Sequence, residues 1–123
     1  MLEAYSIELA VTADSPVTFN SVGVEKGCTA RLASPSTIEL NKCGVYMVSV
    51  DATASASTTL QLTKDGIAQP QAQATGTNPS FVTFVQVPTN NSCCACASPT
   101  KLTVQNTEAV TLNNVNVCVS KLC

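Results

Sequence analysis

The stretch that decides the fold is Leu40-Asn41-Lys42-Cys43-Gly44-Val45-Tyr46-Met47-Val48-Ser49-Val50, and a second run from Thr58 to Thr63 follows it and ends at Lys64-Asp65-Gly66. After Gly44 the first run is rich in β-branched and aromatic residues, a composition typical of β-strands. The glycine that opens it and the Asp-Gly that closes the second run are turn residues. The two runs therefore predict neighbouring strands of an all-β sandwich.

Turn residues recur at short intervals along the rest of the chain, which is typical of short antiparallel strands packed as a sandwich or barrel. They occur at Asp14-Ser15-Pro16, Lys26-Gly27, Ser34-Pro35-Ser36, Gly76–Pro79, Pro88–Ser92, Ser98-Pro99 and Asn113-Asn114. No segment shows a sustained period of 3.6 residues, so we expect almost no helix.

Between the turns, apolar and polar residues alternate as strands require. The alternation predicts one apolar face in each of three segments. These faces are Tyr5, Ile7, Leu9 and Val11 in the first, Leu60 and Leu62 in the second, and Val115, Val117 and Val119 in the third. Ser6, Glu8 and Ala10 are expected on the opposite face of the first segment.

Two strands are apolar on both faces. The residues that alternate along them are Phe81, Val85 and Val87 against Val82 and Phe84, and Tyr46, Val48 and Val50 against Val45 and Met47. One face of a sandwich strand lies in the core and the other normally faces water, so the second apolar face must be covered by something else. We expect that cover to be another copy of the chain, the alternative being a loop.

Length and charge limit the classes of function. The chain has 123 residues, which fits a single domain over 1–123. Its net charge is −2, and charged residues make up only 11% of it. No basic field is available for a phosphate backbone, so we expect no nucleic-acid partner. A surface with so few charges is either neutral and polar or partly hidden in an oligomer, and we favour both.

The segments that target or anchor proteins are not evident in the sequence. Met1-Leu2-Glu3-Ala4 lacks the basic start and the apolar run of a signal peptide. No stretch approaches the roughly 20 apolar residues that cross a bilayer. We therefore expect no membrane insertion.

The quoted runs resemble those of the C1q/tumour-necrosis-factor jelly-roll family, and most closely its bacterial and phage branch, which includes the heads of collagen-like spore-surface proteins. The resemblance rests on Leu40 with Gly44-Val45-Tyr46, on Leu60-x-Leu62 before Asp65-Gly66, on Pro16–Asn20, and on the ending Leu102–Asn106 with Val115–Leu122. It covers about 90% of the chain. It implies a C1q/TNF-like jelly roll of eight to ten antiparallel strands that forms a three-fold homotrimer. The seven cysteines and the absence of a Gly-X-Y repeat depart from the family pattern.

Within that fold, five residues are expected to divide between the core and the trimer axis. They are Tyr46, Met47, Phe81, Phe84 and Val85.

The usual catalytic groups are missing. Histidine is absent, which removes Ser-His-Asp and Cys-His catalysis and His-ligated metals. The eight acidic residues form no close pair in sequence, and Asp65-Gly66 is explained by a hairpin turn. No Gly-rich phosphate loop occurs. We expect neither an enzyme nor a cofactor.

The cysteines leave three interpretations open. They are Cys28, Cys43, Cys93, Cys94, Cys96, Cys118 and Cys123. A zinc site could use the C-x-x-C of Cys93 and Cys96 with the last two cysteines, but the second pair lacks knuckle spacing, so we assign no metal site. A disulfide framework would pair Cys28 with Cys43 and a cysteine of the 93–96 group with Cys118. Reduced thiols are the third interpretation, since no secretion signal is present.

The sequence therefore favours a non-enzymatic, trimeric head or knob of a bacterial surface, spore-coat or phage fibre protein, located on the cell exterior, spore or virion. Its partners would be two further copies of itself and a host-surface glycan or protein receptor. One alternative is a carbohydrate-binding module that uses loop Asn and Gln, although the chain has no Trp and only two Tyr to stack on sugars. The other is a cytokine-like receptor ligand.

Overall fold

The computed structural model describes residues 1–27, 29–87 and 100–122, and within these residues it contains strands and no helix. The strands are β1 (Leu2–Val11), β2 (Ser15–Pro16), β3 (Ser21–Glu25), β4 (Ala30–Ser34), β5 (Thr37–Leu40), β6 (Gly44–Ala54), β7 (Thr58–Lys64), β8 (Ile67–Gly76), β9 (Ser80–Val87), β10 (Thr100–Asn106) and β11 (Val110–Lys121). The prediction of an all-β fold is confirmed. The described residues form one strand more than the eight to ten expected. The additional strand is the two-residue β2, which pairs with β10 through Ser15 and Pro16.

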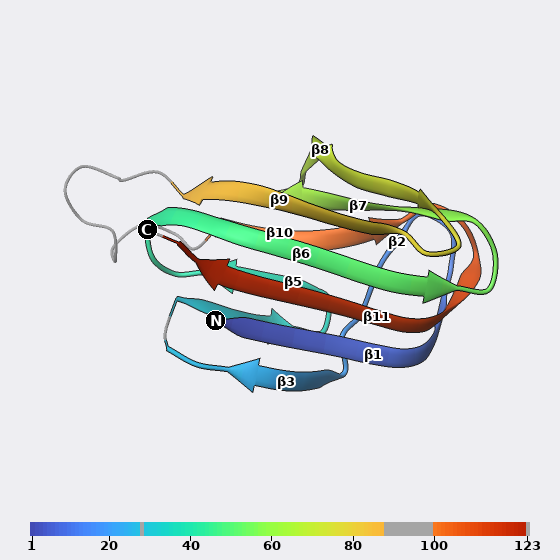
Figure 1. Cartoon of the computed structure of the whole chain (residues 1–123), viewed down its shortest axis with the longest axis horizontal. Coiled ribbons are helices and arrows are strands. Elements are labelled where there is room, and N and C mark those ends of the chain that lie inside the picture. The colour runs from blue at the N-terminus through green and yellow to red at the C-terminus, as the bar shows by residue number, and fades with distance from the viewer. Residues whose placement is uncertain (28, 88–99, 123) are drawn as a thin grey trace.

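The strands form two antiparallel sheets that pack face to face (Figure 1). The front sheet has the order β3-β1-β11-β6-β9, and the back sheet has the order β4-β5-β10-β7-β8. Consecutive strands often lie in different sheets, as the passage from β5 to β6 and from β9 to β10 shows. The chain thus crosses between the sheets several times, as it does in a jelly roll.

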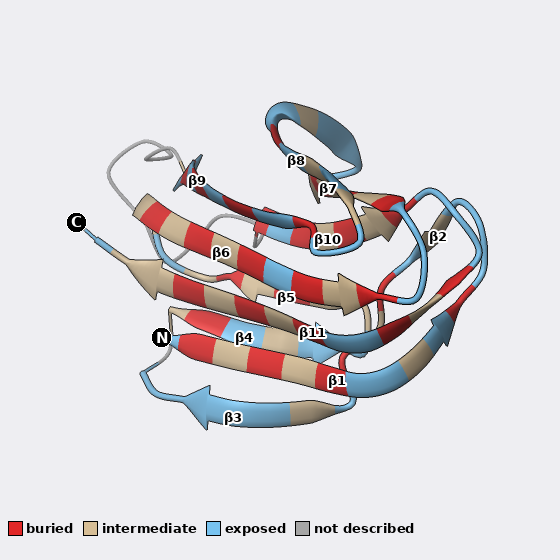
Figure 2. Ribbon diagram, turned by 45° about the vertical axis from the view of Figure 1, so that its right-hand side comes forward, coloured by how far each residue is buried: buried red, intermediate tan, exposed pale blue. Residues whose placement is uncertain are grey.

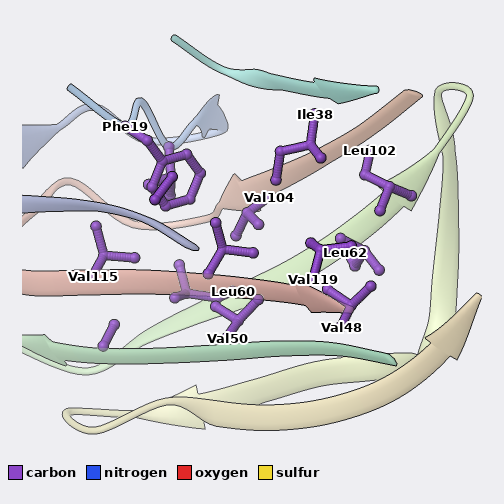
Figure 3. Close-up of a cluster of buried hydrophobic side chains, with 14 of the residues drawn as sticks. Phe19, Ile38, Val48, Val50, Leu60, Leu62, Leu102, Val104, Val115 and Val119 are labelled. Atoms are coloured by element: carbon purple, nitrogen blue, oxygen red, sulfur yellow. The ribbon is translucent and has the colours of Figure 1, made fainter. Parts of the chain in front are cut away.

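The core lies between the sheets and is almost entirely aliphatic (Figure 3). Leu60 and Leu62 point into it from the back sheet, and Val115, Val117 and Val119 point into it from the front sheet. The alternation predicted for these two segments is confirmed. Along β6 and β11 buried and less buried residues alternate in the same way (Figure 2).

Strand β1 departs from its predicted alternation. Ser6 is fully buried, whereas Ile7 is 65% exposed and Tyr5 is half-buried, so the assignment of Tyr5 and Ile7 to one face with the buried Val11 was wrong. Ser6 is accommodated because its hydroxyl donates to the Thr18 carbonyl at 2.6 Å and accepts from the Asn20 amide at 3.0 Å. Glu8 then adopts a left-handed backbone (φ 52°), which shifts the faces before Val11 returns to the core.

The Asp65-Gly66 prediction is confirmed as a two-residue hairpin. Lys64 pairs with Ile67, and Asp65 and Gly66 both have positive φ (51° and 83°). This is the backbone that a type I′ turn requires and that glycine adopts without steric cost. Asp65 also accepts a hydrogen bond from the Lys101 amide at 2.9 Å, which ties the turn to β10.

One polar cluster is buried at the end of the sandwich where β7 begins and β10 ends. Asn106 is fully buried, accepts from the Thr58 hydroxyl at 2.5 Å, and donates to the carbonyls of Thr12 and Glu108. The Glu108 amide in turn donates to the Thr58 hydroxyl at 3.3 Å. A single amide side chain therefore joins three connections that are far apart in sequence.

Candidate functional site

The outward surfaces of the two sheets differ in chemistry. We call the outward-facing residues of β1, β11, β6 and β9 the front face, and those of β10, β7 and β8 the back face. The back face is a polar surface of threonine and glutamine, in which Thr63 lies opposite Thr103, and Gln61 lies opposite both Gln105 and Gln73. The front face instead carries large apolar side chains, and these mark it as the candidate functional surface.

The first apolar group lies on β6 and β9 and consists of Met47, Val82 and Phe84; we call it the β9 corner. Phe84 is 60% exposed and Val82 is 57% exposed. Met47 is half-buried and is the direct register partner of Phe84, so their side chains share one side of the sheet. The prediction that β6 and β9 are apolar on both faces is confirmed.

The second apolar group lies on β1, toward the other end of the sheet, and consists of Tyr5 and Ile7; we call it the β1 corner. Tyr5 pairs with Asn116 and Ile7 with Asn114, which lie four and six residue positions along β11 from Ser120, where Met47 pairs. The two corners therefore lie diagonally across the front face. Val24, on the edge strand β3, is a further exposed apolar residue and pairs with Glu3.

A band of polar residues separates the corners, and we call it the polar diagonal. It comprises Glu3, Asn116, Cys118, Ser49 and Asp51. Glu3, Cys118 and Ser49 follow one another in register across three strands, and Asn116 and Asp51 occupy the next outward-facing register.

Two carboxylates of the polar diagonal are held by neutral donors. The Asn116 amide donates to Glu3 Oε2 at 3.4 Å, and the Ser80 hydroxyl donates to Asp51 Oδ1 at 2.5 Å. A Cβ atom on Gly23 would lie 2.7 Å from Glu3 Oε1, so the carboxylate of Glu3 rests close against the edge strand at Gly23. None of the outward positions of β1, β11, β6 and β9 is lysine or arginine.

Cys118 lies at the centre of the polar diagonal as a free, half-buried thiol. Burial raises the pKa of this thiol, and the negative charges of Glu3 and Asp51 raise it further, while the amino group of Met1 opposes them. The pairing of Cys118 with the 93–96 group, which the disulfide interpretation offered, is therefore wrong, and at Cys118 the structure agrees with the reduced-thiol interpretation.

The other cysteines are only partly covered by the structure. Cys43 takes part in a disulfide bond, as the framework interpretation requires of it. Its expected partner Cys28 lies outside the described residues, as do Cys93, Cys94, Cys96 and Cys123. The zinc interpretation, which needs these residues, stays a hypothesis.

Five residues were expected to divide between the core and a trimer axis, and the part of this prediction that concerns the axis stays a prediction. Tyr46, Phe81 and Val85 are buried in the core, and Met47 and Phe84 lie on the front face. Sequence reasoning missed Tyr5 and Ile7 as surface residues. The only signal for them was that Ala4 and Ser6, both small, interleave with them along β1.

Features of other site classes are absent from the described residues. No group of three or more acidic or cysteine side chains there could hold a metal ion, and no cavity is found that could enclose a small ligand. Among these same residues no helix is long and apolar enough to cross a membrane.

Comparison with known proteins identifies the fold. No family model and no curated protein matches the sequence. The structure is similar to the globular domain of zebrafish complement 1qA (TM-score 0.68, 11% identity, 95% of this chain and 94% of that one) and to the PRD1 vertex protein P5 (0.68, 12%, 99% and 96%). It is also similar to murine APRIL (0.66, 12%, 98% and 98%). The chain therefore has the C1q/TNF-like jelly-roll fold that its sequence predicts.

Proposed function

We propose that this chain is a non-enzymatic head domain that assembles as a homotrimer through its front face, in a bacterial surface, spore-coat or phage fibre protein. The observation that carries the proposal is the contrast between the two outward faces: the front face has two apolar corners and the back face is a threonine and glutamine surface, while Ile67, 69% exposed, lies at the start of β8 in the back sheet. The resemblance to C1q/TNF proteins supports the three-fold arrangement. The likeness in fold to the vertex protein P5 supports the phage or surface context.

The size of the exposed side chains supports association. Phe84, Ile7 and Val82 are each more than half exposed in the isolated chain. Removing such a side chain from water contributes roughly 1–2 kcal/mol, since full burial contributes about 1.5–3 kcal/mol. Each protomer carries both corners, so every contact in a closed ring would bury the β9 corner of one copy and the β1 corner of the next.

The diagonal placement of the corners favours a ring over a face-to-face pair. In a ring of three, the β9 corner of one copy packs against the β1 corner of the next, which is a heterologous contact that closes by rotation. The polar diagonals then face the common axis.

Sedimentation velocity at micromolar concentration tests the proposal. We expect the wild-type chain to sediment as a trimer, and Phe84→Glu and Ile7→Glu each to yield a folded monomer. The matched control is Gln73→Glu, which adds the same charge on the back face and should leave the trimer intact. A wild-type monomer of 12.7 kDa, or a trimer that survives both corner substitutions, would contradict the proposal.

A second candidate, glycan binding, is favoured by one observation. Gln61, Gln73 and Gln105 lie side by side on the back face and can both donate and accept hydrogen bonds. The described residues offer no aromatic platform beside them. Selective and saturable binding on a glycan array, lost in Gln73→Ala and Gln105→Ala, would support this function, and a blank array would count against it.

A further inference from the structure

The polar diagonal carries two carboxylates and one thiol. Glu3 and Asp51 lie on either side of Cys118 on a surface whose outward strand positions carry no lysine or arginine. Their hydrogen-bond donors are the neutral side chains of Asn116 and Ser80. The one positive charge that acts at Cys118 is the amino group of Met1, so two carboxylates face a single cation on this part of the surface.

Burial of uncompensated carboxylates disfavours their charged form. Around the axis of a trimer, three copies of Glu3 and three of Asp51 would share one space, so each carboxylate would also be repelled by its equivalents. The groups that face these carboxylates from neighbouring strands are the Cys118 thiol and, near Cys118, the amino group of Met1. The thiol is neutral at pH 7 and below, because burial raises its pKa.

We propose that trimer assembly through the front face is coupled to protonation of Glu3 and Asp51, so that the trimer tightens as the pH falls from about 8 to about 5. This inference rests on the proposed trimer. It assigns the pH response to carboxylates because the chain contains no histidine. Burial and the approach of like charges both favour the protonated form of a carboxyl group over the charged form.

The direction follows from linkage. If assembly takes up protons, the association constant rises as the pH falls. Uptake of one proton per protomer, three per trimer, changes the association constant by at most about 1,000-fold per pH unit. Even a fraction of this uptake is measurable as a shift in the concentration at which half of the chains are assembled.

The test is sedimentation equilibrium on the full chain between pH 8.0 and pH 5.0 at fixed ionic strength. The variants are wild type, Glu3→Gln with Asp51→Asn, and the control Glu39→Gln. Both amides in the double variant keep an oxygen that accepts from Asn116 and Ser80. Glu39 lies on β5 of the back sheet and pairs with Arg31 at 3.0 Å, so its substitution changes the net charge away from the front face.

We expect the half-assembly concentration of wild type to fall by about ten-fold or more between pH 8.0 and pH 5.0. The double variant should be tightly assembled at both pH values, and Glu39→Gln should behave as wild type. A wild-type trimer whose affinity does not change with pH, or a double variant that keeps the full pH response, overturns the coupling and leaves the trimer standing. A monomer for every variant at every pH overturns the trimer and the coupling together.

Discussion

Replacement of Asn106 by alanine should destabilise the fold more than any other single polar substitution considered for this chain. Asn106 is fully buried and makes three side-chain hydrogen bonds, to Thr58, Thr12 and Glu108. Asn106→Ala would leave a buried hydroxyl without its acceptor and two backbone carbonyls without their donor. Each such buried group costs about 1–3 kcal/mol. Because the two carbonyls are only partly buried, we expect a total loss of roughly 3–5 kcal/mol in the free energy of unfolding.

Urea unfolding followed by circular dichroism measures this loss, at one fixed protein concentration because assembly stabilises the folded state. The control is Gln73→Ala, which removes an exposed amide that donates to the Pro70 carbonyl at 3.2 Å and should change the free energy by less than about 0.5 kcal/mol. A loss below about 1 kcal/mol for Asn106→Ala would refute the reasoning.

The Asn106→Asp variant tests the two hydrogen bonds that the Asn106 amide nitrogen donates in this cluster. It keeps an acceptor for Thr58 but turns a carboxyl group toward the carbonyls of Thr12 and Glu108. A buried carboxyl group titrates above its unfolded value, so the variant should be most stable at low pH and should lose stability as the pH rises. Stability independent of pH would show that the amide does not donate to these carbonyls.

Three further outcomes are expected. Ser6→Ala should lower the free energy of unfolding by about 1–2 kcal/mol in urea titrations, because the Thr18 carbonyl and the Asn20 amide lose a buried partner; an unchanged midpoint would contradict this. Tyr46→Phe should cost about 1 kcal/mol at pH 7, because the hydroxyl donates to the Lys42 carbonyl at 2.7 Å. Burial raises the pKa of Tyr46, so wild type should lose stability above about pH 10, where unfolded tyrosine ionises, and Tyr46→Phe should lose less of it there. For Cys118, whose pKa is also raised by burial, alkylation by iodoacetamide at pH 8 should be slower in the folded protein than in urea, as peptide mapping by mass spectrometry would record.

Much of the fold was predictable because it depends on local rules. Leu60 and Leu62 alternate with polar residues and lie in the core as predicted, and Asp65-Gly66 forms the expected hairpin. Both features depend on the two-residue period of a strand and on the backbone freedom of glycine, which a short window of sequence contains.

The failures were at β1 and Cys118. The sequence pattern predicts Ser6 on the surface, but its hydroxyl is buried. It bonds there to the Thr18 carbonyl and the Asn20 amide, which belong to the segment after β2. One of the three cysteine interpretations paired Cys118 with a loop cysteine, but the position of Cys118 in β11 turns it toward Glu3 and Ser49. In both cases the deciding partner lies far away in sequence.

The sequence by itself determined the strands, their turns, the all-β class and the two-sided apolar character of β6 and β9, because periodicity and turn chemistry act over a few residues. Only the tertiary structure decided which strands became neighbours. That choice placed Met47 beside Phe84, set Tyr5 and Ile7 diagonally across the same face, and left Glu3 and Asp51 between them without a lysine or arginine. Strand order arises from long-range pairing and core packing, which depend on the whole chain at once, and with it comes the surface on which the proposed assembly rests.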